Sequence, residues 1–142
     1  MRSIFINKLN SIYQKDINYH FECLTEITSL PNIDLFDLIR IIGIAYDNAL
    51  EECVNLRHSG INTVEINSML YQSAPNKLEF EIKNTCRNQL ITNKLHQEGI
   101  TNKANHEGLG LATVKKIANK YRNVYIAYSS DNGYFTFTIS IE

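Results

Sequence analysis

Hydrophobic residues recur along the chain at two different spacings, and each spacing predicts one type of element. Over residues 4–15, 35–56 and 111–121 the apolar positions return every three or four residues, which predicts three amphipathic helices. Asp34 stands just before the second of these, as an N-cap residue does, and residues 58–60 mark the end of that helix.

Elsewhere apolar and polar residues alternate, which predicts strands that expose one face. The alternating segments are residues 17–27, 64–70, 78–82, 124–128 and 135–141, with turn residues at 74–76 and 131–133. From this order we expect an α+β fold, a two-layer α/β sandwich in which helices cover one face of a mixed, mostly antiparallel sheet.

A polar stretch of about twenty residues, 85–107, has no sustained period and ends in Gly108-Leu109-Gly110-Leu111. A loop of this length inside a compact domain is usually functional. It leads into the third predicted helix, whose free N–H groups suit a phosphate, and Lys103 lies just upstream. A G-x-G pair is also found at simple loop-to-helix turns, so this segment alone leaves both interpretations open.

The composition limits the classes of function. The 142 residues carry 14 Lys and Arg against 15 Asp and Glu with no basic block, which argues against a nucleic-acid or membrane-surface binder. The three cysteines lie about thirty residues apart without a C-x-x-C pair, as in proteins that form no disulfide in a reducing compartment. The longest apolar run, residues 39–46, is too short to cross a bilayer, and no signal peptide opens the chain, so we expect a cytoplasmic location.

Two asparagines stand where a polar side chain needs an explanation. Asn48 lies on a flank of the second predicted helix that also holds Glu52, Ile41 and Ile44. Oxygen atoms on one helical flank can bind Mg²⁺, although a helical asparagine is more often solvated. Asn84 shares its strand face with the apolar residues before it, so its amide needs a partner. A purine edge is one candidate partner, and the adjacent turn is the other.

Together these features resemble the GHKL nucleotide-binding fold. Gly43-Ile44-Ala45-Tyr46-Asp47-Asn48-Ala49-Leu50-Glu51 resembles the N box, and Gly108-Leu109-Gly110-Leu111-Ala112-Thr113-Val114-Lys115 resembles the G2 box. More narrowly, D-N-A-L-E, then Asn84 at the G1 position, then T-N-K before E-G-L-G-L, is similar to the catalytic domain of peptide-pheromone receptor histidine kinases from Gram-positive quorum-sensing systems. The resemblance covers residues 17–142. It implies a Bergerat-type catalytic domain there, a lid over about 85–107, and an N-terminal helix in residues 1–16 at the end of a linker from an acceptor domain.

The resemblance implies ATP and Mg²⁺ as cofactors and a role for each matching residue. Asn48 is the implied Mg²⁺ ligand, with Glu51 or Glu52 as a helper, and Asn84 is the implied acceptor for the adenine amino group. The implied phosphate contacts are Lys103 and the backbone of Gly108, Leu109, Gly110 and Leu111.

Two positions depart from the family pattern. No glycine follows Asn84 in Asn84-Thr85-Cys86-Arg87-Asn88, although the G1 box normally has two. Ile44 stands where ATP-hydrolysing members carry a Glu that activates water. Without that base we expect slow hydrolysis, whereas phosphoryl transfer to an imidazole depends on positioning and charge neutralisation.

None of the four histidines, His20, His58, His96 and His106, lies in an acceptor-type helix, so we expect the acceptor histidine on a dimerisation domain cut away from this chain. The implied partners are that domain and, through it, a response regulator, with no nucleic acid and no membrane contact by this fragment of a membrane-bound receptor kinase. An anti-sigma-type serine kinase is one alternative. A degenerate nucleotide-binding docking module is another, favoured by the missing G1 glycines and opposed by the intact Gly108 and Gly110.

Overall fold

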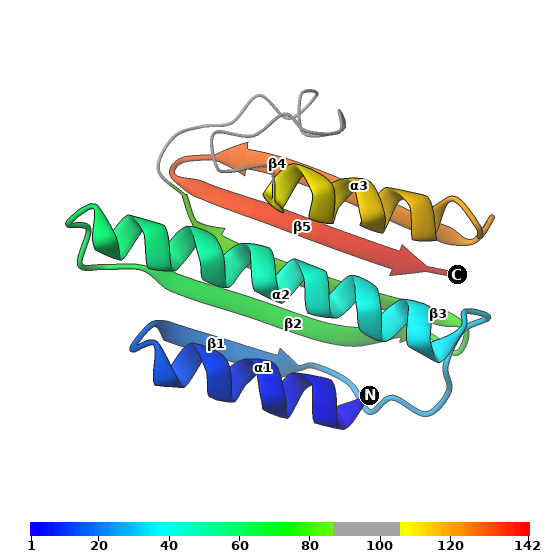
Figure 1. Ribbon diagram of the computed structural model, residues 1–142. Helices are drawn as coiled ribbons and strands as arrows, with labels where there is room; N and C mark the ends of the chain where they lie inside the picture. The colour runs from blue at the N-terminus through cyan, green and yellow to red at the C-terminus, as the bar shows by residue number, and fades with distance from the viewer. Residues whose placement is uncertain (87–105) are drawn as a thin grey trace.

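The computed structural model describes residues 1–86 and 106–142, with the side chains of residues 106–109 not described. Within these residues, three helices lie side by side over one face of a five-stranded sheet (Figure 1). The helices are α1 (Arg2–Gln14), α2 (Leu35–His58) and α3 (His106–Ala118). The strands are β1 (Asn18–Cys23), β2 (Glu65–Ala74), β3 (Lys77–Thr85), β4 (Val124–Asp131) and β5 (Tyr134–Ile141).

The sheet has the order β1-β2-β3-β5-β4, and only its β1–β2 pair is parallel. The parallel pair is joined by α2, since parallel neighbours need a long crossover. The two antiparallel pairs that follow directly in sequence are hairpins. In the second hairpin Asn132 and Gly133 have φ of 52° and 81°, the left-handed conformations that a two-residue hairpin turn requires. The prediction of a mixed, mostly antiparallel sheet with helices on one face is confirmed.

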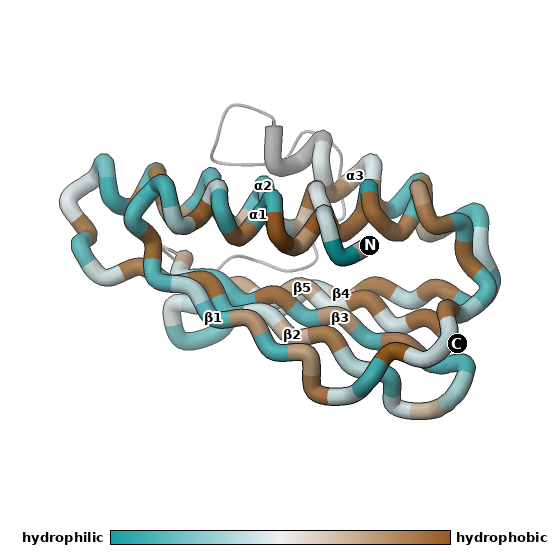
Figure 2. Tube along the Cα trace, turned by 90° about the horizontal axis from the view of Figure 1, so that it is seen from below, coloured by the Kyte–Doolittle hydropathy of each residue, from teal (hydrophilic) through white to brown (hydrophobic). Residues whose placement is uncertain are grey.

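The core lies between the two layers, and α1 contributes to it together with the other helices. Hydrophobic and hydrophilic residues alternate along the strands (Figure 2), and the hydrophobic set faces the helices. Phe5 of α1 packs 6.1 Å from Tyr46 of α2 and 5.9 Å from Phe80 of β3, measured between ring centroids. Ile12 of α1 is also fully buried. No helix in the described residues combines the length and apolar character of a membrane span.

The strand predicted over 17–27 is too long, because β1 ends at Cys23. One more ladder bond follows, from Leu24 N to the carbonyl of Leu70 at 3.0 Å, and the chain then bonds to Gln72. The Gln72 Oε1 atom accepts from Thr28 N at 2.9 Å, and Gln72 Nε2 donates to Ser29 Oγ at 2.8 Å and to Pro75 O at 2.6 Å. Gln72 therefore fastens the β1–α2 connection to the β2–β3 hairpin.

The start of the third helix was also predicted wrongly. It begins at His106 rather than at residue 111, so Gly108 and Gly110 lie inside α3, and it ends at Ala118 rather than at residue 121. Two glycines lower helix propensity, but packing against a neighbouring helix outweighs a propensity cost of about 1 kcal/mol each. Of the lid predicted over 85–107, Thr85 belongs to β3, residues 106–107 belong to α3, and residues 87–105 lie outside the described residues.

Candidate functional site

The flank of α2 that carries Asn48 faces α3. A Cβ atom built on Gly110 of α3 would lie 3.1 Å from Asn48 Oδ1 and 3.4 Å from Asn48 Nδ2. The same atom would lie 3.2 Å from Cγ2 of Ile44, one helical turn before Asn48. The structure therefore brings together Asn48, Ile44 and Gly110, which the sequence analysis selected from segments about sixty residues apart.

A steric effect explains why position 110 carries glycine. Carbon atoms in contact normally stay about 3.5–4.0 Å apart, so a side chain at this position would crowd Ile44. With hydrogen in place of Cβ, the backbone of α3 approaches α2 directly beside the Asn48 amide. This close approach of backbone to a polar side chain is the kind of position where glycine is required.

The amide of Asn48 is only partly satisfied. The side chain is 9% exposed, and its buried Nδ2 atom has no hydrogen-bond partner among the described residues. A buried polar group without a partner is uncommon in native proteins and calls for an explanation such as a ligand. The unpartnered N–H needs an acceptor such as a phosphate oxygen, whereas a cation would be held by Oδ1 of the same amide.

Asn84 occupies the buried face of β3, as its strand parity predicted, and is 3% exposed. Its Nδ2 atom donates to the carbonyl of Thr85 at 2.9 Å, which is the local bond to the adjacent residue that the sequence left open. That bond uses the donor end of the amide and leaves Oδ1 as the end that an adenine amino group would need.

Asn84 lies beneath the second half of α2. The hydroxyl of its neighbour Thr85 accepts from Glu65 N at 3.1 Å, and the Glu65 carbonyl accepts from Cys53 Sγ at 3.7 Å. Cys53 follows Asn48 by five residues, which is a rise of about 7.5 Å along the helix. Asn48 therefore lies about one and a half helical turns before the part of α2 that packs over the end of β3.

Glu52 and Glu51 follow on the same helix. Glu52 lies one turn beyond Asn48, is only 9% exposed and brings a carboxylate to the same flank. Glu51 is half-buried. Ile44 offers no titratable atom, so no carboxylate occupies the position four residues before Asn48.

The structure describes the remaining predicted site residues to different extents. Lys103 lies outside the described residues. Gly108 and Leu109 are in the first turn of α3, where only their backbone is described, and Leu111 is a core residue at 4% exposure. The described residues contain no group of three or more His, Cys, Asp or Glu side chains that could hold a metal ion. A cation bound at Asn48 would therefore depend on oxygen atoms other than those of such a cluster.

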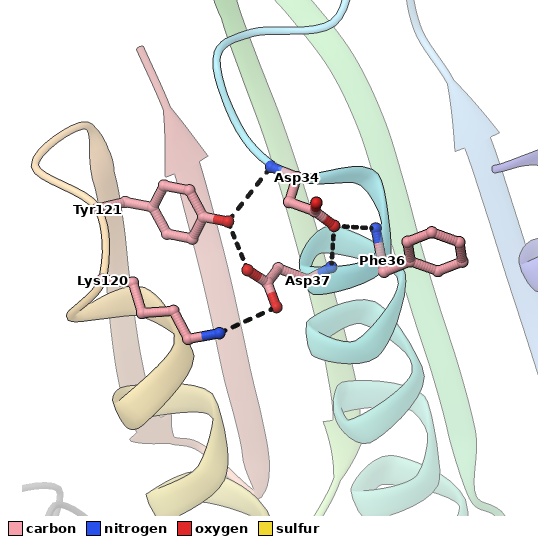
Figure 3. A network of polar contacts seen from close by, with 5 residues as sticks. All are labelled: Asp34, Phe36, Asp37, Lys120 and Tyr121. Atoms are coloured by element: carbon pink, nitrogen blue, oxygen red, sulfur yellow. Dashed lines mark hydrogen bonds and ion pairs between the residues drawn. The ribbon is translucent and has the colours of Figure 1, made fainter.

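One contact between α2 and the segment after α3 was not foreseen from the sequence. The hydroxyl of Tyr121 donates to Asp37 Oδ2 and accepts from the backbone N–H of Asp34 (Figure 3). Lys120 Nζ lies 3.4 Å from Asp37 Oδ1. The sequence indicated Asp34 as a helix-capping residue, but no periodicity could pair Asp37 with a tyrosine 84 residues away.

Comparisons with known proteins agree with this geometry. The sequence model of the family described as the GHKL domain matches residues 33–142. A nucleotide-free form of the catalytic domain of histidine kinase ThkA superposes with a TM-score of 0.77 at 19% identity, over 99% of this chain and 88% of that chain. The mycobacterial sensor histidine kinase MprB superposes with a TM-score of 0.69 at 17% identity, over 99% of this chain and 93% of that chain. The complex of ThkA with response regulator TrrA matches with a TM-score of 0.72 at 16% identity, over 99% of this chain and 38% of that chain. No curated protein matches by sequence.

At these identities the solved structures establish the fold, which is that of histidine kinase catalytic domains, the Bergerat fold. The family model establishes more, because its match extends over well above half of the chain and includes both Asn48 and Gly110. This chain belongs to the GHKL domain family.

Proposed function

We propose that this domain binds Mg²⁺-ATP and donates the γ-phosphoryl group to a histidine on a separate dimerisation domain, as the catalytic domain of a two-component sensor histidine kinase. The observation that carries the proposal is the close apposition of Gly110 to Asn48, whose buried amide is only partly satisfied. The unpartnered Nδ2 donor of this amide would suit a phosphate oxygen, and its Oδ1 would suit the cation that accompanies the phosphate.

Each residue has one role in the proposed site. Asn48 Oδ1 would hold the Mg²⁺ ion, with Glu52 or Glu51 orienting its water shell, and Asn84 Oδ1 would accept from the adenine amino group. The phosphate contacts would be Lys103 and the segment Gly108, Leu109, Gly110 and Leu111. Because α3 begins at His106, its free N–H groups lie in the first turn, before Gly110. The cation supplies neutralisation of phosphate charge, and the protein supplies position.

Ile44 disfavours ATP hydrolysis relative to phosphoryl transfer. Its methyl group packs toward Gly110, so the position from which a carboxylate would activate water is apolar. We therefore expect slow ATP hydrolysis. Transfer to an imidazole needs no such base, because the acceptor nitrogen is itself nucleophilic and has only to be positioned.

Isothermal titration calorimetry with ADP, with and without Mg²⁺, tests binding. We expect binding in both conditions and tighter binding with Mg²⁺, and no heat at millimolar nucleotide would refute the proposal and favour a docking module. Asn48→Ala should remove the Mg²⁺ dependence. Asn55→Ala, at the other asparagine of α2, is the matched control and should keep it.

Asn84→Asp tests the adenine contact separately. The substitution keeps an acceptor oxygen toward the base, so the affinity for ADP should stay the same or improve. Loss of ADP binding in this variant, equal to the loss in Asn48→Ala, would contradict the two assigned roles. Guanosine diphosphate serves as the matched ligand control, because its ring presents a carbonyl where adenine presents an amine.

The acceptor distinguishes the kinase classes. Incubation of the domain with a helical-hairpin acceptor domain and labelled ATP should yield an acid-labile product, since phosphohistidine hydrolyses in acid. An acid-stable product would favour the anti-sigma-type serine kinase instead. We further propose the peptide-pheromone receptor subfamily, a response regulator as downstream partner, and a cytoplasmic domain of a membrane-bound receptor. The ThkA complex with TrrA supports the regulator as a partner class.

A further inference from the structure

Three polar contacts, two by Asp37 and one by Asp34, hold the start of α2 to the segment that follows α3. The Asp37 carboxylate accepts from the Tyr121 hydroxyl and lies 3.4 Å from Lys120 Nζ, while the Asp34 N–H donates to the Tyr121 oxygen at 3.3 Å (Figure 3). The Asp37 side chain is 19% exposed, so these contacts are partly shielded from water. We call Asp37, Lys120 and Tyr121 the α2–α3 clamp.

Tyr121 is rigidly connected to α3 although it lies beyond the end of that helix. The N–H of Tyr121 donates to the carbonyl of Ala118 at 3.0 Å, and the N–H of Lys120 donates to the carbonyl of Ile117 at 3.1 Å. These turn bonds keep both clamp residues against the last turn of α3. A shift of α3 along its axis would therefore move the Tyr121 hydroxyl with it.

The clamp and the candidate nucleotide site lie about three helical turns apart along the contact between α2 and α3. Asp37 precedes Asn48 by eleven residues on α2, and Gly110 precedes Tyr121 by eleven residues at α3. Eleven residues make about three helical turns, so Asp37 and Asn48 lie on the same flank of α2, about 16 Å apart. The two helices run antiparallel, because Asp37 meets Tyr121 and Asn48 meets Gly110.

We propose that Asp37 and Tyr121 are positioning residues for the nucleotide site, because they set the axial register of α3 on α2 that places Gly110 beside Asn48. This inference rests on the proposed function of the site. The apolar residues between the two contacts, Leu111, Val114 and Ile117, bury area through a non-directional attraction, and their interlocking side chains limit how far the helices can slide. The clamp adds a directional contact to this packing. A hydrogen bond from a phenol to a carboxylate is directional and short in range.

The site tolerates little change in register. Sliding α3 by one residue moves its backbone about 1.5 Å, which would replace the Gly110 backbone at Asn48 with that of a residue that carries a Cβ atom. In the present register, a Cβ atom built at position 110 would already lie only 3.1 Å from Asn48 Oδ1. Loss of the clamp should therefore alter the contact that involves the cation more than the contact with adenine.

The test is calorimetric titration of ADP into Tyr121→Phe, with and without Mg²⁺. Tyr71→Phe is the matched control, because the Glu79 carboxylate on the neighbouring strand raises the pKa of the Tyr71 hydroxyl on the open face of the sheet. We expect Tyr121→Phe to weaken the Mg²⁺-dependent part of ADP affinity about 3- to 10-fold and to leave Mg²⁺-free binding within twofold. Tyr71→Phe should change neither.

The Mg²⁺ dependence distinguishes positioning from a merely structural role. In an Asn48→Ala background, Tyr121→Phe should have no further effect on the Mg²⁺ dependence, since both act through one contact. Lys120→Met weakens the clamp at an exposed residue and should show the same pattern to a smaller extent. This second variant keeps the test valid if the tyrosine variant misfolds. Unchanged Mg²⁺ dependence in Tyr121→Phe, or an equal loss with and without Mg²⁺, would overturn this inference while wild-type binding upholds the proposed function. Absence of binding by the wild type would overturn both.

Discussion

Substitution of Gly110 by alanine tests whether α3 approaches α2 as closely as the structure indicates. In most helical positions this change stabilises a protein by about 0.4–1 kcal/mol, because alanine restricts the unfolded chain and favours the helix. Gly43 of α2 provides the comparison, since it also lies within a helix and faces another one. A Cβ atom at Gly43 would lie 3.7 Å from Lys8 Cε and 3.8 Å from Ile4 Cδ1, which are ordinary contact distances.

At Gly110 the added Cβ atom meets groups that cannot both give way. It would lie 3.2 Å from Ile44 Cγ2 and 3.1 Å from Asn48 Oδ1. The Asn48 amide can rotate, but Ile44 is β-branched and has essentially one side-chain rotamer in a helix. Overpacking of this kind costs about 1–3 kcal/mol, which exceeds the gain in helix propensity. We therefore expect Gly43→Ala to stabilise the protein by about 0.5–1 kcal/mol and Gly110→Ala to destabilise it by about 1–2 kcal/mol.

Urea denaturation of the wild type and the two variants, followed by far-ultraviolet circular dichroism, measures both free energies of unfolding. The slopes with urea should be equal, because neither change alters the surface exposed on unfolding appreciably. If Gly110→Ala stabilises the protein as much as Gly43→Ala does, the close approach of the two helices beside Asn48 is refuted. Gly110→Ala should also weaken ADP binding in the presence of Mg²⁺, whereas Gly43→Ala should not.

Three further predictions concern stability. Asp34 Oδ1 accepts from Phe36 N at 2.8 Å and from Asp37 N at 3.3 Å, so Asp34→Ala should cost about 1 kcal/mol in urea unfolding, while Asp34→Asn, which keeps the cap, should cost little. The hydrogen bond from Tyr121 is the main cause of a lowered pKa at Asp37, so the wild type should lose stability as the pH falls below the ordinary value of 3.8, and Asp37→Asn should lose less. Burial raises the pKa of Tyr46 from 10.0 to about 12, so its contribution is present below pH 10 and lost as the pH rises toward 12. Tyr46→Phe should therefore flatten the alkaline limb of the stability profile, and an unchanged slope would contradict the raised pKa.

Local pattern was sufficient for most of the fold, because amphipathic period and strand parity are properties of neighbouring residues. The parity argument placed Asn84 on the buried face of β3, where it is 3% exposed. The angular argument placed Asn48 on a flank shared with Ile44, and both residues meet Gly110. Boundaries were less well predicted at β1 and α3, where tertiary bonds decide how far an element extends. Bonds to Gln72 hold the segment that follows β1, and α3 begins five residues before the apolar period does.

The sequence by itself determined the class of fold, the order of its elements and the residue types of the candidate site, since these follow from period, turn chemistry and motif. Only the tertiary structure decided which of those residues meet and how closely. The clearance at Gly110 and the bond from Tyr121 to Asp37 join positions 62 to 84 residues apart. Such distances depend on how two helices pack against each other on a sheet. A shift of one helix by one residue, about 1.5 Å along its axis, would preserve every local pattern but move the site residues apart.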